Sequence, residues 1–259
     1  MNIAVLVKQV PDTYSERKLR AGDGVLDRDA ADAVIDEIDT RGVEVALQLV
    51  EAQGGEVTVV TMGPERSTDA LRKALAMGAH RAVHVVDDGL AGSDAMGTSA
   101  ALAAALRTLG PDLILAGNEA SDGKGGAVPA MIAERLGLPQ VTSVRKLDVA
   151  DGGLTAERQL EGGFAEVSAS LPAVVSVTEK ITEPRYPNFK GIMAAKSKPV
   201  TVLGLAELGL DAGGAGLAGA AAVVVDAAPR PAKSGGEKVA DDGSGGTKIA
   251  EYLVAARLV

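Results

Sequence analysis

The first 140 residues alternate short apolar runs with longer amphipathic stretches. The run Ile-Ala-Val-Leu-Val at 3–7 is continuous, as expected for a strand buried on both faces. The pattern predicts strands over residues 3–7, 57–61, 82–86 and 113–116, and helices over 30–52, 67–76, 93–109 and 126–136. A chain that alternates strand and helix in this way builds a parallel sheet through right-handed crossovers.

After residue 142 the apolar runs become short, with Gly-Gly or Leu-Pro between them. The segments 153–158, 164–168 and 173–177 favour antiparallel strands added to the sheet, and 201–203 indicates one more strand. Gly, Ala, Pro and Ser then dominate 209–246, before a short helical pattern at the end of the chain. We expect an α/β fold with a Rossmann-like parallel sheet over 1–208. An extended C-terminal arm over 209–259 would pack on something outside this domain.

Composition narrows the function further. The 259 residues include no Cys, which excludes disulfides and thiol catalysis. A net charge of -9 and 2% aromatic residues argue against nucleic acid as a partner. Lys8 interrupts the apolar start too early for a signal peptide, and no run reaches the ~18 residues of a membrane helix. We therefore expect a soluble, cytoplasmic protein without membrane insertion.

Ligands of open parallel sheets bind at the carboxyl ends of the strands. Three loops follow predicted strands there, at 8–12, 61–64 and 117–129. The last is the strongest candidate, because Gly123, Lys124, Gly125 and Gly126 lead into an apolar helix, as a phosphate-binding turn requires. It is not a Walker A loop, and no Gly-x-Gly-x-x-Gly follows the first strand. The alternative is a glycine-rich connection with a helix cap.

The segment 183–196 carries two prolines and an aromatic pair before a short apolar run. Proline restricts its own residue and the one before it, so Tyr186 and Phe189 are expected on a stiff, non-helical loop. Five basic residues against two acidic ones between 179 and 198 leave a local charge of +3. The pattern predicts a docking loop; the alternative is a proline-punctuated connection with a solvated face.

Five aspartates between residues 27 and 39 suggest a metal site at first sight. They are Asp27, Asp29, Asp32, Asp36 and Asp39. Their helical spacing, with apolar residues between them, favours a solvated helix face instead. No Ser-His-Asp set or carboxylate pair is evident, so the sequence offers binding features without a catalytic set.

The chain resembles the β subunit of electron-transfer flavoproteins over essentially its full length. The resemblance is carried by Val-Lys-Gln-Val-Pro-Asp at 7–12, Ala-Leu-Ala-Met-Gly-Ala at 74–79, Ala-Gly-Asn-Glu at 116–119, Leu-Pro-Ala-Val-Val at 171–175, and Glu-Pro-Arg-Tyr at 183–186 with Ile-Met-Ala-Ala-Lys at 192–196. It implies a sheet of the adenine-nucleotide α-hydrolase-like type and an electron carrier, not an enzyme.

The resemblance also implies ligands and partners. An α subunit would hold most of the redox FAD, while this subunit binds a structural AMP. The heterodimer would accept electrons from acyl-CoA and other flavoprotein dehydrogenases and pass them to a membrane quinone oxidoreductase. Residues 209–259 would contact the α subunit.

Site residues follow by position. For the nucleotide they are Leu6, Lys8, Asp36, Glu37, Ile38, Asp39, Met62, Asn118, Glu119, Ala120, Ser121, Asp122, Gly123, Lys124, Gly125, Gly126, Ala127, Val128 and Pro129. For the dehydrogenase partner they are Arg185, Tyr186, Phe189, Ile192 and Met193, with Phe189 near the apolar anchor of the family's recognition loop.

Two alternatives stay open. Electron-bifurcating members of the family bind a second FAD in place of AMP and take part in NADH oxidation. A nucleotide-binding sensor or ATP pyrophosphatase would share the sheet topology. The pyrophosphatases, however, place Ser-Gly-Gly-x-Asp-Ser after the first strand, where this chain has Lys-Gln-Val-Pro-Asp.

Overall fold

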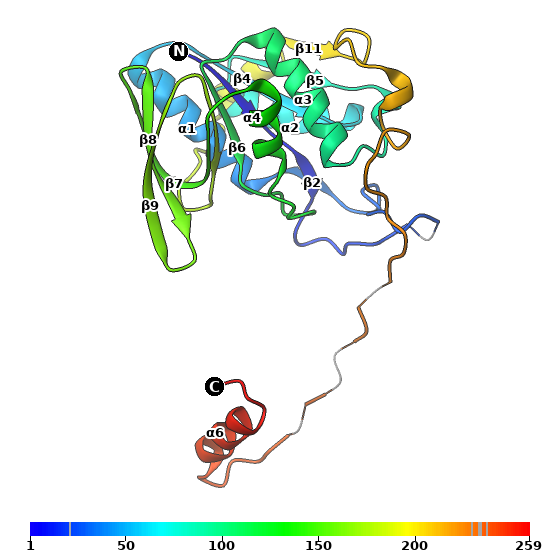
Figure 1. Cartoon of the computed structure of the whole chain (residues 1–259), viewed down its shortest axis with the longest axis vertical. Helices are drawn as coiled ribbons and strands as arrows, with labels where there is room; N and C mark the ends of the chain where they lie inside the picture. The colour runs from blue at the N-terminus through cyan, green and yellow to red at the C-terminus, as the bar shows by residue number, and fades with distance from the viewer. Residues whose placement is uncertain (21, 229, 233–234, 237) are drawn as a thin grey trace. The chain divides into compact units, whose positions relative to one another are not determined.

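The computed structural model describes residues 1–20, 22–228, 230–232, 235–236 and 238–259. These residues form two compact units, Met1–Asp226 and Ala227–Val259. The first unit is built around a sheet of nine strands, which Figure 1 shows with its helices. Within the described ranges, no helix is long and apolar enough to cross a membrane.

The sheet has a parallel part and an antiparallel extension. In spatial order the parallel strands are β11 (Val200–Leu203), β5 (Arg81–Val85), β4 (Glu56–Met62), β1 (Asn2–Leu6), β6 (Leu113–Gly117), β10 (Ala173–Val177) and β7 (Gln140–Ala150). Two antiparallel strands, β8 (Gly153–Leu160) and β9 (Gly163–Ser170), extend it beyond β7. A separate antiparallel pair joins β2 (Gln9–Pro11) to β3 (Ala33–Ile35). The predicted α/β class with added antiparallel strands is confirmed.

One strand differs from expectation. The prediction that 173–177 is antiparallel is wrong, because β10 lies between β6 and β7 and runs parallel to both. All of its residues are buried, so its apolar run is of the kind typical of interior parallel strands. The close spacing of the preceding hairpin strands hid this difference from the sequence pattern.

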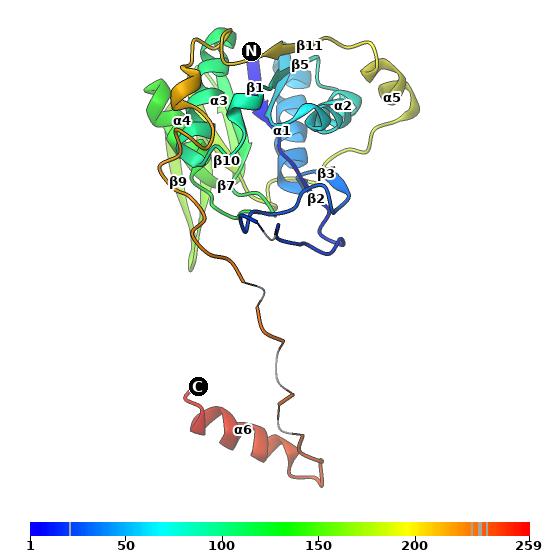
Figure 2. The same cartoon turned by 90° about the vertical axis from the view of Figure 1, so that its right-hand side faces the viewer.

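Helices cover both faces of the sheet. On one face, α1 (Glu37–Gln53) and α2 (Thr68–Met77) pack against Ile3 and Val5 of β1, with the short α5 (Phe189–Ala195) beside α2. On the other, α3 (Ala95–Leu109) and α4 (Val128–Leu136) pack against Ala4 and Leu6. Alternate side chains of one strand point to opposite faces, so β1 joins both layers of the core. Figure 2 shows the two helical layers on either side of the sheet.

The first unit extends beyond residue 208, the boundary expected from composition. Leu210 packs in the apolar cluster around Leu205 and Leu90, and the Leu217 amide donates to the Ala91 carbonyl at 2.9 Å. The Asp94 carboxylate accepts from the amides of residues 221 and 222 at 2.9 and 3.0 Å. Composition does not reveal these contacts, because many of them use backbone amides of small residues.

Short 3-10 helices lie at Glu65–Ser67, Asp88–Leu90 and Ala212–Gly214.

The second unit contains α6 (Gly245–Ala255), which confirms the predicted terminal helix. None of its residues is buried, and Ile249, Tyr252 and Val254 are 63–64% exposed. A helix of this length gains most of its stability from packing its apolar face. The unit itself provides α6 with no such packing in its described residues.

Candidate functional site

The carboxyl ends of the central strands gather several of the predicted nucleotide residues. Leu6 ends β1, Met62 ends β4, and Asn118 directly follows β6. Because β1 lies between β4 and β6, these three positions are neighbours at one edge of the sheet. This is the edge at which open α/β sheets bind their ligands.

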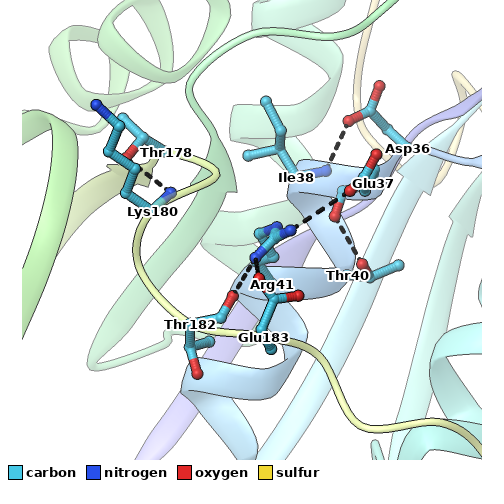
Figure 3. A network of polar contacts seen from close by, with 9 residues as sticks. All are labelled: Asp36, Glu37, Ile38, Thr40, Arg41, Thr178, Lys180, Thr182 and Glu183. Atoms are coloured by element: carbon cyan, nitrogen blue, oxygen red, sulfur yellow. Dashed lines mark hydrogen bonds and ion pairs between the residues drawn. The ribbon is translucent and has the colours of Figure 1, made fainter.

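Helix α1 begins at this edge with a buried acid. Asp36 is its N-cap, and the carboxylate accepts from the Ile38 amide at 3.0 Å. The other oxygen accepts from the Ser121 amide at 2.8 Å, which joins the helix to the loop after β6. The expectation of a solvated helix face is wrong here, because Asp36 is 2% exposed and the helix starts only after it. Figure 3 shows this end of α1.

Asp39, one turn further, connects the two neighbouring loops. Its carboxylate accepts from the Lys8 amide at 2.7 Å and the Gly117 amide at 3.0 Å. Burial, together with the Asp36 carboxylate, raises the pKa of Asp39 to about 8. Glycine at position 117 lets the carboxylate approach this closely, because a Cβ there would lie 2.6 Å from Asp39 Oδ1 and would force a shift. Asp39 thus links the chain just after β1 to the last residue of β6.

Asp122 in the loop after β6 is held by two cations. Lys8 Nζ lies 2.9 Å from one oxygen and Arg28 Nη2 lies 2.6 Å from the other. Although burial would raise it, these two cations keep the pKa of Asp122 below its usual value. Arg17 adds a hydrogen bond to the Ser121 carbonyl at 3.0 Å. Sequence reasoning missed Arg17 and Arg28, because only the folded excursion between β2 and β3 brings them near.

The loop leading into α4 has the backbone freedom expected of it. Lys124 and Gly126 have positive φ angles of 49° and 62°. A Cβ on Gly125 would meet no atom within 4 Å, so this position is open. Among the residues described, no side chain caps the start of α4, where Ala127 is the N-cap. The first amides of a helix without a side-chain cap are available to an anion.

A pocket of about 450 Å³ lies beside this loop. Its lining residues are Asn118, Gly126, Ala130, Gln140, Thr142, Ser143, Arg158 and Ser176. Asn118 Oδ1 is buried and has no hydrogen-bond partner among the described residues. The volume falls within the range of small-molecule sites. Of the predicted nucleotide residues, Asn118 and Gly126 line the pocket, whereas Leu6, Asp36 and Met62 do not.

The predicted docking segment projects apolar side chains from the side of the molecule that carries α2. Tyr186 is 93% and Phe189 79% exposed, and Ile192 and Met193 are about half exposed. The expectation that Phe189 lies on a non-helical loop is wrong, because it is the first residue of α5. Asn188 caps this helix by accepting from the Gly191 amide at 2.8 Å. Pro187 restricts itself and Tyr186 but not the residues that follow, so a helix can begin at Phe189.

Arg185 differs from the other predicted partner residues. Its guanidinium pairs with Glu44 and Glu51 of α1 at 2.7 and 2.5 Å. Arg41 of α1 makes a similar contact with the two residues at 182 and 183. Its Nη1 donates to the Thr182 carbonyl at 2.6 Å and pairs with Glu183 at 2.9 Å, as Figure 3 shows. Both arginines therefore connect α1 to the docking segment.

Comparison with known proteins agrees with this architecture. A family model described as electron transfer flavoprotein domain matches residues 23–208. The Mycobacterium tuberculosis protein named electron transfer flavoprotein subunit beta is 58% identical over 264 residues, which cover 100% of this chain and 99% of the relative. A Bacillus subtilis protein of the same name is 39% identical and 82% of each chain is covered. The caffeyl-CoA reductase-Etf complex subunit CarD of Acetobacterium woodii is 36% identical, with 92% of each chain covered.

The fold defines an open α/β protein whose candidate site lies at the carboxyl edge of a parallel sheet. The match over 23–208 and the near full-length identities go further. The chain belongs to the electron transfer flavoprotein family and is one of its β subunits. The family resemblance read from the sequence motifs is thereby confirmed.

Asp39 yields a prediction about pH. Its folded-state pKa of about 8 lies above the ordinary 3.8, so between these values the folded protein retains a proton that the unfolded chain releases. Stability of the native chain should therefore fall as the pH rises through this window, and Asp39→Asn should lack this component. Thermal unfolding midpoints of both proteins, compared across this pH range, provide the measurement. Parallel pH profiles would show that Asp39 ionises as an ordinary carboxyl.

Proposed function

We propose that the chain binds AMP at the carboxyl edge of its sheet and pairs with an α subunit that holds most of the redox FAD. The heterodimer then accepts electrons from flavoprotein dehydrogenases, acyl-CoA dehydrogenases among them, and delivers them to a membrane quinone oxidoreductase. The β subunit acts as a cytoplasmic electron carrier without a catalytic set of its own. The observation that carries the nucleotide part is the polar pocket beside Asn118 and the start of α4.

The residues around the pocket suit a nucleotide. The amides that precede α4 are available to a phosphate, and the buried Asn118 Oδ1 lacks a donor that a nucleotide hydroxyl or amino group would supply. Asp36 and Asp39 have a different role, because their carboxylates already accept from protein amides. They support the site by accepting hydrogen bonds from the amides of Lys8, Gly117 and Ser121, at the ends of β1 and β6 and in the loop after β6. AMP adds no redox chemistry, whereas FAD in the α subunit supplies the electron-accepting group.

A second FAD in place of AMP is the alternative, and one relative favours keeping it. The Acetobacterium woodii protein is named as a subunit of a caffeyl-CoA reductase-Etf complex. Identification of the nucleotides released from the purified heterodimer distinguishes the two possibilities. A ratio of one FAD and one AMP supports the carrier, and two FAD support bifurcation. Membership of the electron transfer flavoprotein family favours the carrier and the bifurcating protein over a nucleotide-binding sensor or an ATP pyrophosphatase.

Gly126 provides the test of the nucleotide site. Gly126→Val should greatly reduce retention of AMP, because a β-branched residue at a φ of 62° distorts the loop that presents the amides. Gly110→Val is the matched control, because Gly110 also has a positive φ of 54°, its Cβ would meet no atom within 4 Å, and it is the C-cap of α3, outside the loop. Mass spectrometry of the denatured proteins measures the bound nucleotide. Stoichiometric AMP in the Gly126 variant would place the site elsewhere.

The separate second unit suits attachment to the α subunit. Ile249, Tyr252 and Val254 expose an apolar surface on α6 that its own unit does not cover in the described residues. Exposed apolar helix faces are typical of contacts with another chain.

Two truncations separate this role from stability. A chain ending at Asp226 should fold with a thermal midpoint near that of the full chain but copurify poorly with the α subunit. A chain ending at 208 should also be destabilised, because it loses the contacts of Leu210 and Leu217 and those of the Asp94 carboxylate. Copurification of the 1–226 chain with α at full yield would contradict the assignment.

The docking loop supports the proposed contact with a dehydrogenase. Tyr186 and Phe189 are the most exposed of its apolar side chains, and Lys190 and Lys196 of the same segment are also exposed. A groove of about 660 Å³ lies between this segment and α2, lined in part by Tyr186 and Ile192. A projecting aromatic beside a largely apolar groove is the kind of surface that forms hot spots.

Phe189→Ala should weaken docking by about 2 kcal/mol, roughly thirtyfold in affinity. The Michaelis constant of an acyl-CoA dehydrogenase for the heterodimer should rise, while reduction by a small chemical reductant stays unchanged. Flavin and AMP content and the thermal midpoint should also stay near the native values, because an exposed side chain contributes little to the core. Val202→Ala, on the exposed edge strand β11, is the control. An equal loss with both electron donors would exclude docking as the role of Phe189.

A further inference from the structure

The Arg185 side chain and amide are fully engaged with helix α1. Nε and Nη2 donate to the two oxygens of Glu44 at 2.7 and 3.0 Å, and Nη1 and Nη2 donate to those of Glu51 at 2.5 and 3.0 Å. The backbone amide of Arg185 adds a bond to Glu44 at 3.1 Å. One residue thereby joins the docking segment to two positions on α1 that lie about two turns apart.

We propose that Arg185 is a positioning residue: its clamp on Glu44 and Glu51 fixes the docking loop in the form that presents Tyr186 and Phe189 to the partner. The inference rests on the proposed docking function and deepens it. It replaces the expectation, drawn from the family resemblance, that Arg185 itself contacts the dehydrogenase.

Glu44 is built to receive this arginine. Its side chain is only 6% exposed, and Gln48 Nε2 orients it through a bond of 2.9 Å. Although burial favours the neutral form, the hydrogen bonds from Arg185 keep the pKa of Glu44 below its usual value. A buried carboxylate without its cation is strongly disfavoured, so loss of Arg185 would leave Glu44 as an unpaired buried charge. The planar guanidinium serves two carboxylates at once, which a lysine ammonium on a flexible stem does not.

The remainder of the segment is fixed at both ends. Upstream, Arg41 holds the carbonyl of Thr182. Downstream, Arg72 of α2 donates to the carbonyls of Ala195 and Lys198 at 2.6 and 3.0 Å. Gly191 lets α5 approach α2, since a Cβ there would lie 2.4 Å from the Ala76 carbonyl. Between the two anchored ends, Arg185 holds the chain to α1 directly before Tyr186.

A loop held in its bound form does not lose further conformational freedom when the partner arrives. Release of the clamp transfers that ordering to the docking step, and we expect the affinity for the partner to fall roughly tenfold or more. The chemistry at the flavin should be unaffected. The clamp therefore predicts a change in the Michaelis constant and none in the maximal rate.

The experiment compares Arg185→Lys, Glu51→Gln and the double variant with Phe189→Ala in the intact heterodimer. Both clamp variants should raise the Michaelis constant for an acyl-CoA dehydrogenase without changing reduction by a small chemical reductant. The double variant should be little worse than Arg185→Lys, because the two changes break the same contact. Amide exchange of residues 183–190 should accelerate in each clamp variant, and Glu65→Gln, a neutralised glutamate outside the clamp, should change nothing. Glu51 is largely exposed, so its variant is expected to fold even if others do not.

The outcomes distinguish failure of the clamp from failure of the docking function. If Phe189→Ala weakens docking and Arg185→Lys does so too, but Glu51→Gln changes neither docking nor exchange, Arg185 acts on the partner directly and the clamp is overturned. If Phe189→Ala alone has an effect, the clamp is likewise overturned while the docking function stands. If Phe189→Ala has no effect, the docking function itself fails, and the inference fails with it.

Discussion

The two carboxylates at the start of α1 are the contacts on which the carboxyl edge of the sheet depends. Asp36 and Asp39 lie among apolar strands and accept from four backbone amides, two of them at the ends of β1 and β6 and one in the following loop. Burying an acid is unfavourable unless such bonds compensate. The loop after β6, which contributes Asn118 and Gly126 to the pocket lining, is therefore anchored to the start of α1 through Gly117 and Ser121.

The same helix supports both proposed activities. Its first turn holds the loops beside the pocket, and the turns that follow hold the docking segment through Arg41, Glu44 and Glu51. The 17-residue helix has an apolar stripe packed against the sheet, which fixes it as one rigid element. A change that shifts α1 against the sheet would move both surfaces together.

The parts of the fold that follow from local periodicity could be predicted from the sequence. The strands β1, β4, β5 and β6 and the helices α2 and α3 appear where the alternation of apolar residues places them. The helix expected over 30–52 begins only at Glu37, after the short strand β3. What periodicity does not contain is pairing over long distances in the chain. The pattern of 173–177 gives no direction for β10, and the composition of 209–226 gives no sign that its amides bind Asp94.

In the candidate site, too, local features could be predicted from the sequence and long-range contacts could not. Glycine spacing and strand ends indicated the loop after β6, which in the structure leads into α4 and contributes Asn118 and Gly126 to the pocket lining. The role of a charged side chain depends on what faces it. Asp36 and Asp39 have the spacing of a solvated face yet are buried, since the helix starts at 37 and turns them inward. Arg185 has the position of a partner contact, but two glutamates some 140 residues earlier, Glu44 and Glu51, engage it.

The two borders of the sheet have unequal consequences for handling the isolated chain. At one border β11 is short, with four residues. At the other, β9 offers eight residues without lysine or proline and with one charge, Glu166. A long border strand with unpaired amides and carbonyls is a template for another strand unless charge, proline or a bulge prevents it. In the described sheet, Glu166 is the one protective feature of this kind on β9. The isolated chain is therefore exposed to self-association at β9, which favours coexpression with its partner over refolding alone.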